Sequence, residues 1–250
     1  MNIIALTQAR VGSSRFPNKV LKPINGESLL KIHLKRILKS ELISELIVAT
    51  TKEKEVDKII NIANECNVSC FQGHLNNVLD RFYQAVKDKN ADYIVRLTSD
   101  CPLIDAKLID KVIKYTIEKD LDYCSNVLDE MFPDGQDVEV FKFSALEKAW
   151  KEVVLASDKE HVTPYIYKNS SYRNSMMFKS DMYLFDTNYS HVRLTVDEPD
   201  DFVVIEKIIK ELGTNKTWLE YTKYYLESDI SEINRRIKRN ERYQKSLKHD

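Results

Sequence analysis

The stretch ADYIVRLTSDCPLID, residues 91–105, carries the pattern that decides the fold class. It opens with DYIVRLT, a run of apolar and β-branched residues that is typical of a buried strand. Pro102 lacks a backbone N–H and stops the strand, so that Asp100 is left at its carboxyl end. Asp105 stands where a helix of residues 105–118 begins, and its side chain is suited to cap that helix. The stretch therefore predicts a strand, a polar turn and a helix in immediate succession.

The same strand–turn–helix unit is predicted for most of the first two-thirds of the chain. Continuous apolar runs predict strands, and apolar residues at helical spacing predict helices. The strands are expected at residues 2–8, 45–51 and 68–71, and the helices at residues 28–39, 54–66 and 76–87. This alternation predicts an α/β fold with a mostly parallel sheet and helices on both faces.

The middle of the chain departs from this rhythm and predicts a smaller mixed β/α insertion at about residues 125–190. The expected elements here are strands at residues 122–127, 136–143 and 182–186, and helices at residues 145–153 and 159–167. A strand at residues 191–197 is then expected to lead into an amphipathic helix with Pro199 in its first turn.

Length and charge limit the classes of protein to which the chain can belong. The 250 residues fit one α/β domain, expected at residues 1–228, followed by a basic C-terminal helix at residues 229–250. With 38 Lys and Arg against 39 Asp and Glu, the charge balance argues against a general nucleic-acid-binding surface. The basic run RRIKRNERYQKSLK, residues 235–248, is interpreted as a solvated helix face.

The apolar runs and the cysteines predict a soluble, cytoplasmic protein. No apolar run approaches the roughly 18 residues that a membrane-spanning helix needs, and the N-terminus does not have the pattern of a signal peptide. The cysteines form no CxxC pair, which favours reduced thiols over a zinc site or disulfides. They are Cys66, Cys70, Cys101 and Cys124.

A polar loop, QARVGSSRFPNK, follows the first predicted strand. Ligands of open parallel sheets bind at the carboxyl ends of the strands, so this loop is a candidate phosphate-binding loop. Gly12 allows close approach of backbone N–H groups to a triphosphate. Arg10, Arg15 and Lys19 supply the positive charge that a triphosphate needs. The Walker A spacing is absent, and on residue types alone a solvated basic loop is the alternative.

Two aspartates, Asp100 and Asp197, end predicted strands that we expect to be neighbours. A strand-end carboxylate can hold Mg²⁺ through one or two oxygens, with phosphate and water supplying the rest. The pair is therefore a candidate magnesium site, with turn or capping aspartates as the alternative. Asp200 and Asp201 fall in the first turn of the next helix, where we expect them to stabilise its dipole.

Seven ordered motifs extend the pattern from residue 3 to about residue 210. They are QARVGSSRFPNKVLKPINGESLL, ELIVATT, NNVLDRFYQA, ADYIVRLTSDCPLID, FPDGQDVEVF, EHVTPYIY and HVRLTVDEPDDF. With these motifs the chain resembles the cytidylyltransferase family that includes the CMP-KDO and CMP-sialic acid synthetases. The sugar synthetases usually read PAR in the first loop, whereas this chain reads QAR with Gln8, which favours the SpsF-like branch of spore coat polysaccharide biosynthesis.

The resemblance implies a Rossmann-like nucleotidyltransferase fold that transfers CMP from CTP to an acceptor and releases pyrophosphate. The implied acceptor is a small acidic sugar, a ulosonic or nonulosonic acid, in surface polysaccharide or glycan biosynthesis. Arg15, Lys19 and Asp100 are then the expected catalytic residues, and Asp100 and Asp197 the expected ligands of a Mg²⁺ cofactor. The expected nucleotide-binding residues are Gln8, Ala9, Arg10, Gly12, Ser13, Arg15, Lys19, Gln72, Gly73 and Arg81.

Several of these residues have a simpler structural interpretation. A plain turn is the alternative for Gln72 and Gly73, and an ordinary helix ion pair with Asp80 is the alternative for Arg81. The expected acceptor-binding residues are Asp134, Gln136, Glu139 and His161. A structural hydrogen bond is the alternative for His161. Alternation in PDGQDVEVF leaves the direction of Asp137 open.

The acceptor residues and the insertion bear on assembly as well as on chemistry. Asp134, Gln136 and Glu139 could form a dimer contact instead, because family members commonly dimerise through the inserted region, here residues 125–190. The resemblance therefore implies a homodimer. Two other functions also fit the sequence: transfer to a sugar phosphate or phosphonate, and a nucleotide-binding homologue without catalysis. The presence of two strand-end carboxylates argues against the second.

Overall fold

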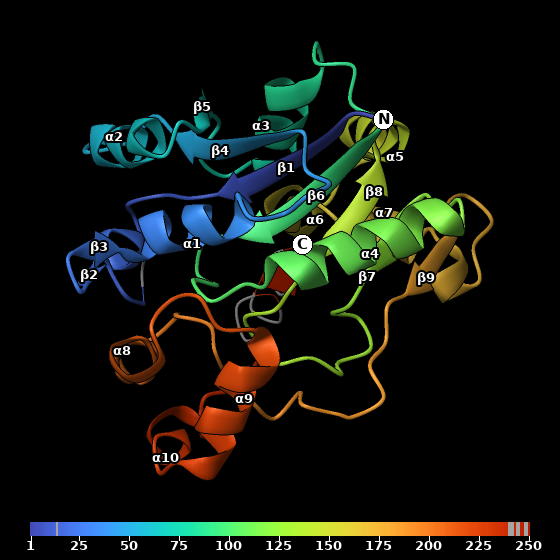
Figure 1. The fold of residues 1–250 in the computed structure, drawn as a ribbon. Coiled ribbons are helices and arrows are strands. Elements are labelled where there is room, and N and C mark those ends of the chain that lie inside the picture. The colour runs from blue at the N-terminus through green and yellow to red at the C-terminus, as the bar shows by residue number, and fades with distance from the viewer. Residues whose placement is uncertain (14, 240–242, 244–245, 248–249) are drawn as a thin grey trace.

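The computed structural model of the chain describes residues 1–13, 15–239, 243, 246–247 and 250 (Figure 1). Its central sheet has the strand order β5-β4-β1-β6-β8-β7-β9. These strands are β1 (Ile3–Gln8), β4 (Glu45–Thr51), β5 (Ser69–Gly73), β6 (Tyr93–Thr98), β7 (Tyr123–Ser125), β8 (Glu139–Lys142) and β9 (Ser180–Met182). Strands β5, β4, β1 and β6 run parallel, and β8 is antiparallel to both β6 and β7. The mostly parallel sheet is thus confirmed.

Helices cover both faces of the sheet, because successive residues of a strand point to opposite sides. In β1, Ile3 and Ala5 belong to one apolar core, and Ile4 and Leu6 belong to the other. The first core is covered by α1 (Leu29–Ile37), α2 (Asp57–Glu65) and α4 (Ala106–Glu118). The second is covered by α3 (Val78–Val86), α5 (Phe143–Glu152) and α7 (Pro164–Lys168), and α6 (Ala156–His161) packs against α3.

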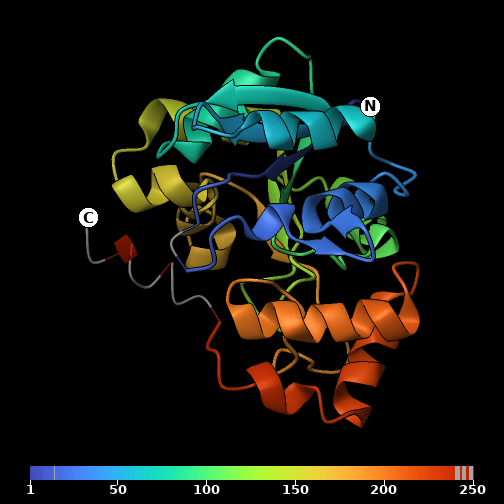
Figure 2. The same ribbon diagram turned by 90° about the vertical axis from the view of Figure 1, so that its left-hand side faces the viewer.

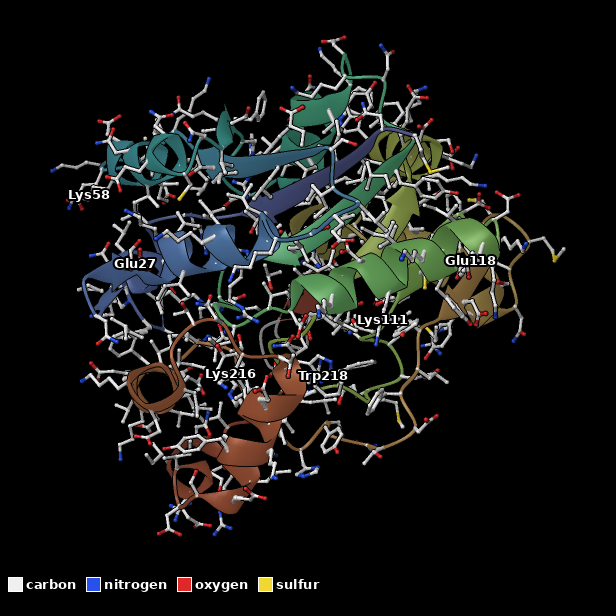
Figure 3. All side chains as sticks on the ribbon, viewed as in Figure 1. Glu27, Lys58, Lys111, Glu118, Lys216 and Trp218 are labelled. Carbon is white, nitrogen blue, oxygen red and sulfur yellow. The ribbon has the colours of Figure 1, made fainter. Side chains whose placement is uncertain are left out.

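A third group of helices lies beyond α1 and forms the lower part of the molecule in Figures 1 and 2. It consists of α8 (Pro199–Leu212), α9 (Trp218–Glu227) and α10 (Ser231–Asn234). Leu29 and Ile32 of α1 share an apolar core with Val204 and Ile208 of α8. Trp218, labelled in Figure 3, stands at the start of α9, where its backbone N–H donates to Asp105 Oδ2 (2.8 Å).

The remaining short elements are the 3-10 turns η1 (Lys19–Leu21) and η2 (Ser171–Arg173), and a small hairpin of β2 (Pro23–Ile24) and β3 (Glu27–Ser28). The fold-deciding stretch behaves as predicted. Asp105 caps α4, accepting hydrogen bonds from the backbone N–H groups of Lys107 (2.8 Å) and Leu108 (3.4 Å). Among the described residues no helix combines the length and the apolar character needed to cross a membrane.

The strand predicted at residues 191–197 is wrong. This segment is extended, but it makes one isolated bridge, between Arg193 and Asp134, instead of joining the sheet. Its backbone pairs with loops: Leu194 N–H donates to the Asp134 carbonyl (2.7 Å), and Val196 N–H donates to the Asp100 carbonyl (2.8 Å). The hydrogen-bonding groups of the segment are therefore used by the loop after β6 and the loop before β8.

The single helix predicted at residues 159–167 is divided into α6 and α7. Val162 breaks it with a φ of 73°, in the left-handed region that a β-branched residue rarely adopts. Pro164 follows, and a proline lacks the N–H that a continuing helix requires. Pro164 instead takes the first position of α7, where that loss costs nothing.

Two other predictions are displaced. The strand expected at residues 182–186 is β9, which ends at Met182. Within the C-terminal helix expected over residues 229–250, Ser231–Asn234 form α10, residues 235–239 are not helical, and Tyr243 and Ser246 are again helical. The chain leaves the helix there, and Arg239 reaches the Phe132 carbonyl (3.1 Å). Residues 240–242, 244–245 and 248–249 of that prediction lie outside the described residues.

Candidate functional site

A cavity of about 430 Å³ opens at the carboxyl ends of β1 and β6. Its walls come from the loop after β1, the turn after β6, the start of α3, strand β8, the α6–α7 junction and residues 195 and 197. Lys238 and Tyr243, near the end of the chain, complete the lining. The position agrees with the general rule that open α/β sheets bind ligands beyond the carboxyl ends of their strands.

One ammonium group joins the two predicted metal aspartates. Lys19 Nζ lies 3.1 Å from Asp100 Oδ2 and 2.8 Å from Asp197 Oδ1, and it also donates to the Val196 carbonyl (2.8 Å). Asp100 lies in the turn two residues after the end of β6, whereas Asp197 is brought beside it by the backbone bond from Val196 to the Asp100 carbonyl. The structure therefore places both carboxylates around one point, although only Asp100 directly follows a strand of the sheet.

The three charges control each other's ionisation. Burial lowers the pKa of Lys19, but the charges of Asp100 and Asp197 outweigh burial and raise it above its usual value. Burial raises the pKa of Asp100, but the charge and hydrogen bond of Lys19 outweigh burial and hold it well below its usual range. Asp100 is consequently an anion at every physiological pH, ready to face a cation.

Arg15 extends this cluster from the same loop. Its guanidinium lies 2.7 Å from Asp197 Oδ1 and 3.3 Å from Glu198 Oε1. The loop is folded over the carboxylates partly because Asn18 takes a left-handed conformation (φ 59°) immediately before η1 and Lys19. Arg15 and Lys19 thus both contact Asp197, and both line the cavity.

The donor set of Asp100 and Asp197 fits a magnesium ion that is held in part by its substrate. Two carboxylates converge on one cation, and Mg²⁺ usually takes one or two carboxylates together with substrate phosphates and water. In the described part of the chain no three or more His, Cys, Asp or Glu side chains are grouped to hold a metal. A site made by the protein alone is therefore not the arrangement seen.

The side of the cavity formed by the predicted nucleotide-binding residues, here called the nucleotide side, contains buried polar atoms without partners. Gln8, Ala9, Arg10, Ser13 and Arg81 line it. Gln8 Oε1 and Arg81 Nε are buried and have no hydrogen-bond partner. Such atoms are costly unless a ligand satisfies them. Burial, then the nearby charge of Arg10, lowers the pKa of Arg81 to about 10.

Three predicted nucleotide-binding residues do not line the cavity: Gly12, Gln72 and Gly73. Gly73 acts through packing, since a Cβ there would lie 2.9 Å from Arg81 Cγ. A Cβ on Gly12 would lie 2.7 Å from Glu53 Oε1, so Gly12 leaves room for a neighbouring strand-end loop. Arg81 itself donates to the His74 carbonyl (3.1 Å), while Asp80 accepts from Trp150 Nε1 (2.9 Å).

Of the predicted acceptor-binding residues, Asp134, Glu139 and His161 line the cavity and Gln136 does not. The Gln136 amide is fully buried and has a structural role, accepting from Asp105 N (3.0 Å) and donating to the Leu103 carbonyl (2.9 Å). Glu139 forms an ion pair with Arg96 and accepts from Tyr123 Oη (2.7 Å). His161 Nε2 hydrogen-bonds Ser246 Oγ (3.1 Å).

The sequence analysis missed the arginines that pair with acids on the side of the predicted acceptor-binding residues, here called the acceptor side. Arg193 grips Asp201 with two hydrogen bonds (2.8 and 2.9 Å) and donates to Asp134 Oδ2 (2.6 Å). Arg239 donates to Asp137 Oδ1 (2.7 Å). Asp137 lines the cavity, which settles its direction. Asp201, which was predicted to stabilise a helix dipole, also accepts hydrogen bonds from the buried Arg193. The only sequence signal for these arginine partners was the acidic residues of PDGQD and DEPDD.

Two acids of this side, Asp134 and Asp137, are less readily ionised than Asp100. Burial, followed by repulsion from Asp137, raises the pKa of Asp134 to about 7, against the opposing charges of Arg239 and Arg193. Burial also raises the pKa of Asp137. Gly135 between them has a φ of 110°, and a Cβ there would lie 2.6 Å from the Leu194 carbonyl carbon. A glycine is therefore required for this loop to reach residues 193–195.

Most of the chain matches known proteins. The chain is 42% identical over 204 residues to an uncharacterized protein, MJ1063, of Methanocaldococcus jannaschii. The match covers 81% of this chain and 81% of that protein. It is 27% identical over 222 residues to the spore coat polysaccharide biosynthesis protein SpsF of Bacillus subtilis, covering 85% of this chain and 88% of that protein. A shorter match, 32% over 114 residues, is with the 3-deoxy-manno-octulosonate cytidylyltransferase of Trichlorobacter lovleyi, covering 46% and 44%.

Solved structures agree. A cytidylyltransferase from Leptospira borgpetersenii superimposes with a TM-score of 0.87 at 31% identity, covering 94% of this chain and 98% of that one. The family model described as Cytidylyltransferase matches residues 4–237. The chain belongs to the cytidylyltransferase family.

Proposed function

From its membership of this family, we propose that the chain transfers CMP from CTP to a small acidic sugar, with Mg²⁺ as cofactor and release of pyrophosphate. The acceptor we propose is a ulosonic or nonulosonic acid used in surface polysaccharide or glycan synthesis in the cytoplasm. One observation carries the proposal: Lys19 bridges Asp100 and Asp197 beside Arg15, in the lining of the cavity. Fixed cations and two converging carboxylates are what a metal-bound triphosphate requires.

The proposed reaction is an in-line displacement at the α-phosphorus. The acceptor oxygen forms a bond to phosphorus as the bond to pyrophosphate breaks, so negative charge grows on the departing oxygens. Arg15 and Lys19 neutralise that charge, and Lys19 is held in its charged form by the carboxylates around it. Asp100 and Asp197 would hold Mg²⁺, which supplies a Lewis acid for the phosphoryl oxygens.

The nucleotide would occupy the side of the cavity with unsatisfied polar atoms. Gln8 presents a buried acceptor and Arg81 a buried donor. A cytosine carries both an amino donor and ring acceptors, so it can donate a hydrogen bond to Gln8 Oε1 and accept one from Arg81 Nε. The acceptor would lie toward Asp134, Glu139 and His161, across the Lys19 cluster.

We also propose that the chain forms a homodimer through residues 125–190. Large apolar side chains in this region are exposed, among them Met176 (97%), Val154 (80%) and Leu184 (54%). Exposed apolar patches often mark protein interfaces. Light scattering of the purified protein should give twice the mass of the chain, and a monomer at micromolar concentration would contradict this part of the proposal.

The function is tested by measuring pyrophosphate release with each of the four NTPs and Mg²⁺, against ulosonic acids, nonulosonic acids and sugar phosphates. We expect release with CTP and one or more of the acids. Release with a sugar phosphate alone would replace the proposed acceptor class. Equal rates with all four NTPs would remove the assignment of CTP.

A further inference from the structure

Two residues from the far end of the chain, Lys238 and Tyr243, line the cavity. They follow α10 and lie outside the insertion in which the acceptor residues were expected. Lys238 is exposed, and within the described residues it forms no ion pair. Lys238 is thus an ammonium group that faces the cavity and is not committed to a protein carboxylate.

The neighbours of Lys238 and Tyr243 hold them in place. Arg239 donates to the Phe132 carbonyl (3.1 Å) and to Asp137 Oδ1 (2.7 Å), which fastens the backbone next to Lys238. Tyr243 Oη lies 2.6 Å from Tyr167 Oη. The Tyr243 ring meets the His161 ring edge to face, with centroids 5.0 Å apart. The two lining residues are therefore each anchored to the insertion, on the acceptor side.

Carboxylates also line this side, and an anionic acceptor would be repelled unless they were neutralised. Each of three acids has an arginine partner. Asp134 is paired with Arg193, Asp137 with Arg239, and Glu139 with Arg96. Arg239 additionally lies 3.7 Å from Glu130. Glu130 and Glu160 also line the cavity, and Arg193 is shared with Asp201, so the three arginines offset only part of the negative charge of this wall. The positive charge of Lys238 adds to that compensation.

We propose that Lys238 is a specificity-determining residue that binds the carboxylate of an acidic acceptor. Arg239 acts as a positioning residue, because it fastens the segment and neutralises the acids beneath it. Tyr243 closes the same wall with its ring against His161. This inference rests on the proposed function, since it names the partner of the acceptor's acidic group.

The test compares one acid with its uncharged twin. Binding of 3-deoxy-manno-octulosonate and of its carboxamide is measured by calorimetry on the full chain, in the wild type and in Lys238→Met. We expect the wild type to bind the acid on the order of tenfold more tightly than the amide, the usual scale of a charge-assisted contact. In Lys238→Met that preference should vanish while CTP binding stays the same, and Lys238→Arg should retain part of it.

Lys223→Met is the matched control, because Lys223 is an exposed lysine on α9 remote from the cavity lining. Its preference for the acid should equal that of the wild type. The inference is overturned if acid and amide bind the wild type equally, if neither binds, or if Lys238→Met keeps the preference. Pyrophosphate release from CTP with an uncharged acceptor would leave CMP transfer standing while the inference failed. If no acceptor gave pyrophosphate release but the preference for the acid still depended on Lys238, the inference would stand and the proposed CMP transfer would fail.

Discussion

The two sides of the cavity are built in different ways. The nucleotide side comes largely from one loop, and its residues Gln8, Arg10, Arg15 and Lys19 lie within a dozen positions of one another. The acceptor side is assembled from the loop before β8, the α6–α7 junction and the C-terminal residues, which pair through arginines. A local loop can be recognised from spacing, whereas an assembled wall depends on partners that only folding brings together.

The largest expected effect tests whether Asp100 and Asp197, which lie between the two sides of the cavity, act together. Asp100→Asn and Asp197→Asn should each lower turnover by about 10²–10³-fold, the scale of a lost electrostatic contact in a transition state. The double variant should be little worse than either, because both act on one cation. Steady-state kinetics across Mg²⁺ concentrations measures this.

Asp200→Asn provides the control, since Asp200 is an exposed acid three residues from Asp197. It should keep wild-type turnover and lose only the small dipole contribution of about 0.3–1 kcal/mol. Near-normal turnover of Asp197→Asn at saturating Mg²⁺ would show that the two aspartates do not act on one shared cation.

The second prediction concerns the nucleotide side alone. Arg15→Ala removes a charge-assisted contact and should weaken CTP binding by about 1.5–3 kcal/mol, with little change in melting temperature. Arg15 is partly exposed and its ion pair with Asp197 contributes little to folding for that reason. Calorimetric titration with CTP measures the effect, and Arg173→Ala, at an exposed arginine, is the control. If Arg15→Ala unfolded instead of losing affinity, Arg15 would have a structural role.

The third prediction concerns how the acceptor side is assembled. Gly135→Ala should destabilise the fold by about 1–3 kcal/mol, because the new methyl group would meet the backbone of Leu194. Gly26 also has a positive φ, 82°, but no atom lies within 4 Å of a Cβ there. Gly26→Ala should therefore show only the backbone strain. Equal losses for both variants in urea unfolding would mean that contact with Leu194 contributes nothing.

The smallest effect is a pH dependence on the acceptor side. The pKa of Asp134 is raised to about 7, so ionising it in the folded protein is unfavourable, and its contribution to stability falls as pH rises from about 4 to 7. Asp134→Asn removes that loss. The free energy of unfolding of the variant, relative to the wild type, should thus improve between pH 5 and pH 8. A constant difference across this range would show that Arg193 keeps Asp134 ionised throughout.

Much of the framework could be predicted from short stretches. ELIVATT at residues 45–51 is β4, and Asp105 caps α4, because apolar runs and caps are local signals. The segment at residues 191–197 has the apolar residue pattern of a strand, but it lies outside the sheet. Propensity could not distinguish these cases, since the difference lies in which backbone the segment meets.

The sequence by itself determined the family, the α/β order of elements and the loop with Arg15 and Lys19, because each depends on residues that are close along the chain. Only the tertiary structure decided that Lys19 would contact Asp100 and Asp197, which are 81 and 178 positions away along the chain, and that Arg193 and Arg239 would pair with acids of the far wall. Ion pairs between distant residues leave no periodic trace in a sequence. Their energies depend on distance and burial, which exist only once the chain has folded.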